Sequence, residues 1–232
     1  LSDKTKAVIV NSPNNPSGTV YTEETLKKLA EILKKKEAEF KTHIYLISDE
    51  PYREILFDGL KYPFVTNFYD NSIVCYSFSK CMSIPGERIG YALVSPDAYQ
   101  SKRIIDAIAG AERIIGHVCA PTLMQKALTC IIGHYSNMKE YEDNRNALHK
   151  GLTELGYECN YPKGSFYMFL KALEPDDDQF ALKAREFDII LVPAKGFGCP
   201  GYVRLAFCVK TEMIERCFGA FKKLKEYYDN KK

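Results

Sequence analysis

The chain has 232 residues, of which 46% are hydrophobic and 27% charged, and its formal net charge is +2. This length allows one large domain or two modest ones, each with its own core. The near-neutral charge argues against a nucleic-acid surface built on bulk positive charge, and no apolar run approaches the length of a membrane span. No secretory signal opens the sequence, so a cytoplasmic location is expected.

Cysteine and histidine are not arranged for metal binding. The eight cysteines include no Cys-x-x-Cys pair, and the four histidines form neither a His-x-x-x-His pair nor a mixed cluster with cysteine. We therefore expect free thiols in a reducing compartment rather than a disulfide framework or a zinc site.

Residues 7–94 combine short apolar strands with one long helix. Strands are expected at four apolar runs, Ala7–Val10, Ile44–Ile47, Ile73–Tyr76 and Tyr91–Val94. The helix follows Thr22, a good N-cap residue, and has apolar residues at helical spacing, namely Leu26, Leu29, Ala30 and Leu33. Continuous apolar runs separated by a helix or a long connection are typical of strands buried on both faces. We therefore predict an α/β architecture with a mainly parallel sheet.

After Pro96 the sequence changes to mainly helical patterns. Helices are expected over residues 101–111 and, as one longer helix, over residues 121–155. The rest mixes short elements: a strand at 165–170, a helix at 178–187, a strand at 189–192, a glycine-rich turn at 196–201, a strand at 202–207 and a last helix from Thr211. This mixture predicts a small α+β domain. We expect the large domain to cover residues 1–134 and the small domain residues 135–232.

The beginning of the sequence indicates a longer protein. Leu1 is not an initiator methionine, and the pattern of a buried strand already begins at Ala7. We therefore expect the chain to be the C-terminal portion of a longer one. A sheet without its outer strands would expose edges and apolar surface.

Polar residues follow three of the predicted strands, at their carboxyl ends. The first strand leads into residues 11–18, the second into residues 48–52, and the third into Ser77-Phe78-Ser79-Lys80. Ligands bind at this edge of open α/β sheets, so parallel neighbouring strands would bring the three segments together. A buried lysine tends to lose its charge, and the neutral amine of Lys80 would attack carbonyl groups. With two hydroxyls and Arg88 nearby, the pattern indicates a cofactor that is both an aldehyde and a phosphate.

Several of these residues also have an ordinary structural explanation. Asn15-Pro16-Ser17-Gly18 has the composition of a turn, Asp49 could cap a helix, and Tyr52 could be a packing aromatic. Lys80 alone would be a solvated side chain, and Arg88 could pair with an acid such as the adjacent Glu87.

Arg204 is unusual because it lies in an apolar strand. Its neighbours Val203 and Leu205 face one side of that strand, so the guanidinium faces the other side. A guanidinium placed there needs an anion, which is either an internal acid or the carboxylate of a ligand.

In combination, these motifs resemble those of the class I/II aminotransferases of fold type I, which use pyridoxal 5′-phosphate (PLP). The motifs occur in the order Asn15-Pro16-Ser17-Gly18, Asp49-Glu50-Pro51-Tyr52, Ser77-Phe78-Ser79-Lys80, Arg88 and Arg204. The resemblance spans nearly the whole chain. It implies part of the large α/β/α domain of PLP fold type I, followed by the small α+β domain, in an enzyme of amino acid metabolism.

The resemblance implies catalytic roles for three residues. Lys80 would form a Schiff base with PLP and then move the proton between the substrate Cα and the cofactor. Asp49 would pair with the protonated pyridine nitrogen and keep the ring an electron sink. Tyr52, together with Asn15, would hydrogen-bond the 3′ oxygen of the ring.

The remaining roles concern binding. Ser77, Ser79 and Arg88 would hold the phosphate, with Arg88 supplying paired donors. Arg204 would bind the α-carboxylate that amino acid and 2-oxo acid substrates share, and Asn15 would also bind the substrate. The full-length protein would be a homodimer without nucleic-acid or membrane partners.

The same scaffold supports other reactions. Carbon–sulfur lyases of this fold commonly carry histidine where this chain has Tyr52, so the tyrosine favours transamination, whereas Ser17 in place of the usual threonine is a mild change. A PLP-dependent lyase and an aminotransferase-like sensor domain of a transcription regulator remain alternatives. The resemblance also implies that part of the cofactor shell precedes Leu1, so the chain alone is expected to be inactive and to bind PLP weakly.

Overall fold

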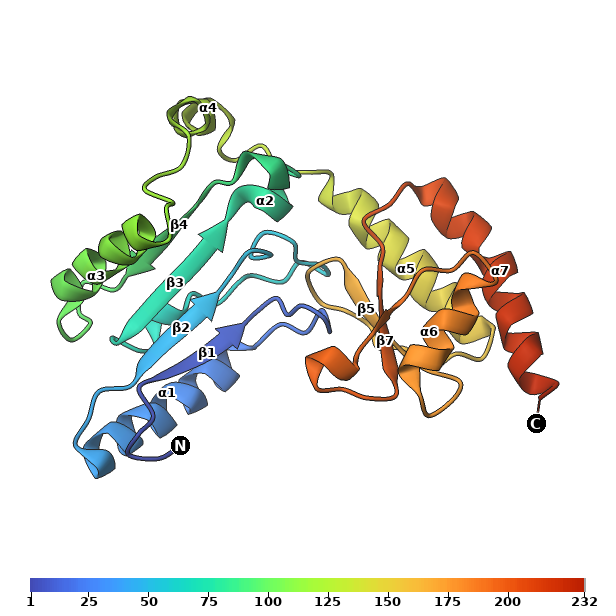
Figure 1. Cartoon of the computed structure of the whole chain (residues 1–232), viewed down its shortest axis with the longest axis horizontal. Coiled ribbons are helices and arrows are strands. Elements are labelled where there is room, and N and C mark those ends of the chain that lie inside the picture. The colour runs from blue at the N-terminus through green and yellow to red at the C-terminus, as the bar shows by residue number, and fades with distance from the viewer. Residues whose placement is uncertain (232) are drawn as a thin grey trace. The chain divides into compact units, whose positions relative to one another are not determined.

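The computed structural model describes residues 1–231, which divide into two compact units. The first unit consists of Leu1–Pro13, Val20–Glu54 and Gly59–Ser136. The second unit consists of Asn14–Thr19, Ile55–Asp58 and Asn137–Lys232, of which the last residue is outside the described range. Each unit contains one β-sheet and its own helices (Figure 1).

The sheet of the first unit has four strands in the order β1-β2-β3-β4. They are β1 (Ala7–Asn11), β2 (Tyr45–Asp49), β3 (Ser72–Ser77) and β4 (Gly90–Val94). The first three are parallel neighbours, and β4 runs antiparallel to β3. The predicted strands and the mainly parallel sheet are therefore confirmed, and the carboxyl ends of β1, β2 and β3 lie at the same edge.

The long helix α1 (Glu23–Phe40) covers one face of this sheet (Figure 1). The Thr22 side chain caps the helix by accepting a hydrogen bond from the Thr25 N–H at 3.1 Å, as predicted. The buried core joins residues of the helix to residues of the sheet, namely Leu26, Ala30, Leu33, Val10, Leu46 and Val74. Burying an aliphatic side chain of this kind stabilises the fold by about 1.5–3 kcal/mol.

The expectation that the strands are buried on both faces is wrong. In β2 and β3 buried residues alternate with half-buried ones, and Ile9 in β1 keeps 70% of its surface exposed. The two faces of the sheet are covered to different extents. Helix α1 packs on one face, whereas helix α3 (Ser101–Ile114) buries none of its residues. Asp49 and Cys75 belong to the less covered face, where they lie opposite each other on β2 and β3.

The predicted helix over residues 121–155 is two helices. Helix α4 (Thr122–Ile131) ends before Gly133, whose positive φ of 90° interrupts helical geometry. Helix α5 (Met138–Glu154) begins after Asn137, whose side chain accepts a hydrogen bond from the Glu140 N–H at 3.3 Å.

The second unit contains a small antiparallel sheet in the order β5-β7-β6. Its strands are β5 (Tyr167–Lys171), β6 (Val192–Pro193) and β7 (Tyr202–Ala206). Its other helices are α6 (Asp177–Arg185) and α7 (Thr211–Asp229). The predicted strand at 189–192 is mostly absent, because only Val192 and Pro193 pair with β7 and Ile190 is 82% exposed.

Helices α5 and α7 pack closely in this unit. A Cβ added at Gly151 of α5 would lie 2.2 Å from a ring carbon of Phe218 in α7, so a larger residue there would require the Phe218 ring to move. Short helical turns complete the chain: η1 (Val65–Asn67), α2 (Phe78–Cys81), η2 (Pro85–Glu87) and η3 (Lys195–Phe197). Among the described residues, no helix has both the length and the apolar character to cross a membrane.

Candidate cofactor and substrate site

The eight candidate residues divide between the two units. Six belong to the first unit: Asp49, Tyr52, Ser77, Ser79, Lys80 and Arg88. The other two, Asn15 and Arg204, belong to the second unit and are in direct contact. Each unit therefore holds its own group of candidate residues.

Asp49 is the last residue of β2 and lies beside the last residue of β1, Asn11. The Asn11 side-chain amide donates to Asp49 Oδ2 and to the Asp49 backbone carbonyl, each at 3.0 Å. Burial raises the pKa of the Asp49 carboxyl above its ordinary value, and the hydrogen bond from Asn11 acts in the opposite direction. A half-buried carboxylate of this kind favours a cationic or strongly donating partner.

Asn11 is a residue whose role the sequence did not reveal. In the sequence it only begins the polar segment after the first predicted strand, whereas the parallel register places it directly opposite Asp49. Asn11 and Asp49 are neighbours only through the pairing of β1 with β2. The register of that pairing must be known before Asn11 can be assigned to the site.

Lys80 lies in the four-residue helix α2, which begins directly after β3. The Ser77 hydroxyl caps this turn by accepting from the Ser79 N–H at 3.1 Å, and it donates to Ser79 Oγ at 2.7 Å. The Lys80 side chain is half-buried, and within residues 1–231 its amine forms no ion pair or hydrogen bond. The amine is therefore available to a ligand at the edge where β1, β2 and β3 end.

Arg88 is exposed and follows the short turn η2. Its Nη1 donates to the backbone carbonyl of Pro85 at 2.9 Å. The alternative that it pairs with Glu87 is not observed, since no described acid forms an ion pair with it. Most of the guanidinium donors thus remain free for a planar or tetrahedral anion.

A buried polar cluster holds the loop that follows β2. The Glu50 carboxylate is fully buried and pairs with Arg53 at 3.2 Å, and burial raises its pKa. Arg53 also donates to the Tyr91 hydroxyl at 2.8 Å and stacks over the Tyr76 ring at 4.2 Å. Tyr52 lies within this loop and is only 3% exposed. These contacts fix the direction in which the loop leaves Asp49.

In the second unit, Arg204 projects from the centre of β7. Its Nη1 donates to Asn15 Oδ1 at 2.8 Å, and its guanidinium lies over the rings of Tyr167 at 4.3 Å and Phe197 at 5.2 Å. The alternative of an internal acid partner is not observed among the described residues. A cation that lies over two rings, with a neutral amide as its partner, suits a carboxylate ligand.

The turn that carries Asn15 is held by its own residues. Asn14 Oδ1 accepts from the Ser17 N–H at 3.0 Å and from the Ser17 hydroxyl at 2.7 Å. Gly18 closes the turn with a φ of 69°, and a Cβ there would lie 2.4 Å from Pro162 Cβ. Glycine is therefore required at this position both for the backbone angle and for the close approach to the segment around Pro162.

Comparison with known proteins identifies the family. The sequence profile of "Aminotransferase class I and II" matches residues 1–221. A probable aspartate aminotransferase of Methanocaldococcus jannaschii is 32% identical over 97% of this chain and 60% of its own length. An aspartate aminotransferase of Bacillus subtilis is 30% identical over 97% of this chain and 59% of its own length.

Solved structures show the same fold. An amino transferase from Eubacterium rectale is 52% identical and matches 98% of this chain and 57% of its own with a TM-score of 0.94. A Thermus thermophilus aspartate aminotransferase variant is 28% identical and matches 97% of this chain and 61% of its own with a TM-score of 0.81. The chain spans about three-fifths of the length of these relatives, and its fold is PLP fold type I. The chain belongs to the class I and II aminotransferase family.

Proposed function

We propose that this chain carries the Lys80-centred part of a PLP-dependent aminotransferase, which exchanges an amino group between an amino acid and a 2-oxo acid. The observation that carries the proposal is the half-buried Lys80 amine, without a protein partner among the described residues, just after β3. The neighbouring strand β2 ends in Asp49, whose carboxyl is held by Asn11.

The donor set of the first unit fits PLP. When bound, PLP supplies an electron sink that makes a proton on the substrate Cα easier to remove. The half-buried Asp49 carboxylate would accept a hydrogen bond from the protonated ring nitrogen, a partner that offsets the cost of burying the charge. The hydroxyls of Ser77 and Ser79 and the free donors of Arg88 suit the phosphate oxygens.

Lys80 would have two tasks. Its Nζ would hold the cofactor through the aldehyde group, and the same Nζ would take the proton from the substrate Cα and return it in the later step. Tyr52 and Asn15 would donate hydrogen bonds to the 3′ oxygen of the ring. These donors would stabilise negative charge on that oxygen.

Arg204 would bind the α-carboxylate of the substrate. Its guanidinium is oriented by Asn15 and stacked on Tyr167, so two donors can face two carboxylate oxygens without a large loss of side-chain entropy. Amino acids and 2-oxo acids both carry this carboxylate, which explains how one subsite would serve both halves of an exchange.

A panel of amino donors tests the proposed reaction on the full-length protein. We expect a 2-oxo acid product from the donor together with an amino acid from the added 2-oxo acid, in equal amounts. Release of ammonia and pyruvate would instead support the lyase alternative. Binding of a donor without any turnover would support a sensor domain.

We also propose that the full-length protein forms a homodimer in the cytoplasm. Six large apolar residues within or near α3 and α4 are more than half exposed: Ile105, Ile114, Ile115, Val118, Leu123 and Ile132. An exposed apolar surface of this kind favours association. Light scattering on the full-length protein would give twice the chain mass, and a monomer at all concentrations would contradict the dimer.

Weak PLP binding by the 232-residue chain alone stays a prediction. A strong yellow absorbance from that chain after addition of PLP would contradict it.

A further inference from the structure

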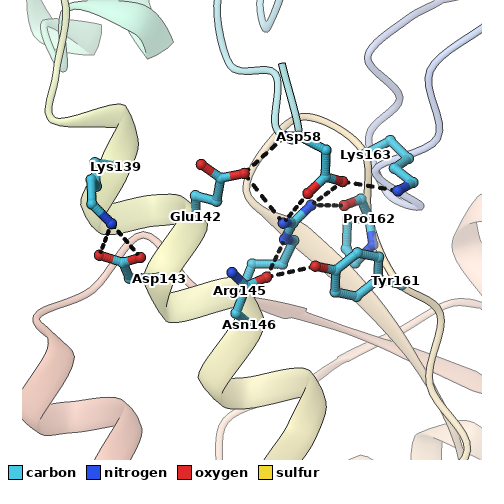
Figure 2. A network of polar contacts seen from close by, with 9 residues as sticks. All are labelled: Asp58, Lys139, Glu142, Asp143, Arg145, Asn146, Tyr161, Pro162 and Lys163. Atoms are coloured by element: carbon cyan, nitrogen blue, oxygen red, sulfur yellow. Dashed lines mark hydrogen bonds and ion pairs between the residues drawn. The ribbon is translucent and has the colours of Figure 1, made fainter. Parts of the chain in front are cut away.

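Arg145 on α5 is a fully buried cation in the second unit, with 0% of its side chain exposed (Figure 2). Its Nη2 and Nη1 donate to the two carboxylate oxygens of Asp58, at 2.8 and 3.1 Å. Nη1 also donates to the Pro162 carbonyl at 3.0 Å. The guanidinium lies over the rings of Phe57 and Tyr161, with its Cζ 4.7 and 4.2 Å from the ring centroids.

The remaining contacts satisfy this buried charge. Nε donates to Asn146 Oδ1 at 3.1 Å, and Nη2 approaches Glu142 Oε1 at 3.5 Å. Asp58 in turn accepts from Lys163 Nζ at 2.8 Å, and hydrogen bonds from Arg145 and Lys163 hold the pKa of its carboxyl well below its ordinary value. A buried guanidinium with paired, directional donors fixes the geometry of its partners more tightly than a surface ion pair does.

The partners of this cluster include the segment 160–165. Arg145 binds the Pro162 carbonyl, Lys163 binds Asp58, and the Phe57 N–H donates to the Lys163 carbonyl at 3.1 Å. The Tyr161 hydroxyl donates to Asn146 Oδ1 at 2.7 Å, on the helix that carries Arg145. The cluster therefore sets the position of this segment from both its side chains and its backbone.

The same segment supports the turn that carries Asn15. The N–H groups of Lys163 and Gly164 both donate to the Gly18 carbonyl at 3.0 Å. The Asn160 side chain donates to the Ser17 carbonyl at 2.5 Å. Because Gly18 has no Cβ, the turn can pack directly against the segment at Pro162.

The segment 160–165 also positions Tyr167, whose ring stacks with Arg204. It runs into β5 through Ser165, which is fully buried with a φ of 58°, and the Tyr167 ring then lies under the Arg204 guanidinium. Both the amide partner of Arg204 and one of its stacking rings thus depend on where residues 160–165 lie. Among the described residues, no hydrogen bond or ion pair joins Asp58, Arg145 or Lys163 to Arg204.

We propose that Asp58, Arg145 and Lys163 form a positioning cluster that sets the geometry of the Asn15–Arg204 carboxylate subsite, an inference that rests on the proposed function. These residues act through the segment 160–165 and touch neither substrate nor cofactor. Loss of the cluster is therefore expected to weaken carboxylate binding and to leave the steps at Lys80 nearly unchanged.

The test compares two aspartate-to-asparagine substitutions in the full-length protein. Asp58→Asn removes the charge that pairs with Arg145, whereas Asp143→Asn breaks the exposed Lys139–Asp143 pair on the same helix (Figure 2). With the best donor of the panel, Asp58→Asn should raise KM for both the amino acid and the 2-oxo acid by roughly tenfold or more. For Asp58→Asn, kcat and the absorbance of the bound cofactor should stay within about twofold of wild type. For the control Asp143→Asn, KM and kcat should both stay within about twofold of wild type.

A second pair of variants, at Lys163, tests the proposal even if Asp58→Asn fails to fold. Lys163 is 49% exposed and, within residues 1–231, makes one ion pair, so Lys163→Met should fold and should raise KM by roughly threefold or more. Lys163→Arg keeps the charge and should have the wild-type KM. Unchanged KM in Asp58→Asn and Lys163→Met, or equal losses of kcat in both, would overturn the positioning cluster. An inactive wild-type protein would contradict the proposed function itself, so the two failures are distinct.

Discussion

The Lys80 region of the first unit and the Arg204 region of the second differ in how far their polar groups are already paired. Lys80 has no polar protein partner among the described residues, and Arg88 uses one donor on a backbone carbonyl. Arg204, in contrast, already binds Asn15 and stacks on Tyr167. The first arrangement suits a group that stays bound and supplies the missing partners. The second suits small carboxylates that bind and leave, because a pre-ordered site loses less entropy at each binding event.

Removal of the Lys80 amine should produce the largest effect. In the full-length protein, Lys80→Ala is expected to lower kcat/KM by at least about a thousandfold, since both covalent binding and proton transfer are lost. Steady-state kinetics measures the loss, and Lys35→Ala, at an exposed position of α1, is the control. A Lys80→Ala enzyme with a tenth of wild-type activity would rule out these roles.

Asp49→Asn should rank second. The amide cannot carry the negative charge that a protonated ring nitrogen requires, so kcat is expected to fall roughly 10²- to 10³-fold while the protein still folds. Rates of a single turnover, followed by cofactor absorbance, measure this step. Asp97→Asn replaces an exposed aspartate and should behave as wild type. Equal rates for the two variants would remove Asp49 from the mechanism.

Arg204→Lys should affect binding more than chemistry. Lysine keeps the charge but loses the paired donors, and a lost charged hydrogen bond of about 1.5–3 kcal/mol corresponds to roughly a 10- to 100-fold rise in KM. The rise should be similar for the amino acid and for the 2-oxo acid. Arg103→Lys, on the exposed side of α3, is the matched control. A KM change for one substrate only would argue against a shared carboxylate subsite.

The smallest effect concerns stability and pH. The folded-state pKa of Asp58 lies below its ordinary value of 3.8, so its ion pairs stabilise the protein above that pH and this contribution is lost as the pH falls. At pH 7, Asp58→Asn should lower the Tm of the full-length protein by roughly 2–8 °C. Thermal unfolding at pH 7, 5 and 3 should show this difference shrinking toward pH 3. A difference that is constant over this range would contradict the assignment.

The sequence predicted the elements whose pattern is local. The strands of the first unit, the Thr22 cap and the apolar positions of α1 follow from apolar runs and helical spacing, and all are observed. The break between α4 and α5 was missed, because the apolar periodicity of Leu128, Ile131 and Ile132 continues up to Gly133.

Long-range features could not be predicted. Asp58 and Arg145 are 87 residues apart in sequence, and their ion pair exists only because the fold brings them together. The position of Asn11 beside Asp49 likewise depends on strand register. Residues 189–191 were predicted as a strand but have no pairing partner among the described strands. The roles of Lys80 and its neighbours, and the domain boundary at residue 134, stay predictions.

Borohydride treatment of the full-length protein with PLP tests the central claim most directly. Reduction fixes the cofactor on the lysine that binds it, and peptide mapping by mass spectrometry then identifies that residue without reference to activity. We predict that the label is found on Lys80, in the peptide that contains Ser77-Phe78-Ser79-Lys80. Labelling of a different lysine, or no labelling of a protein that performs transamination, would contradict the account.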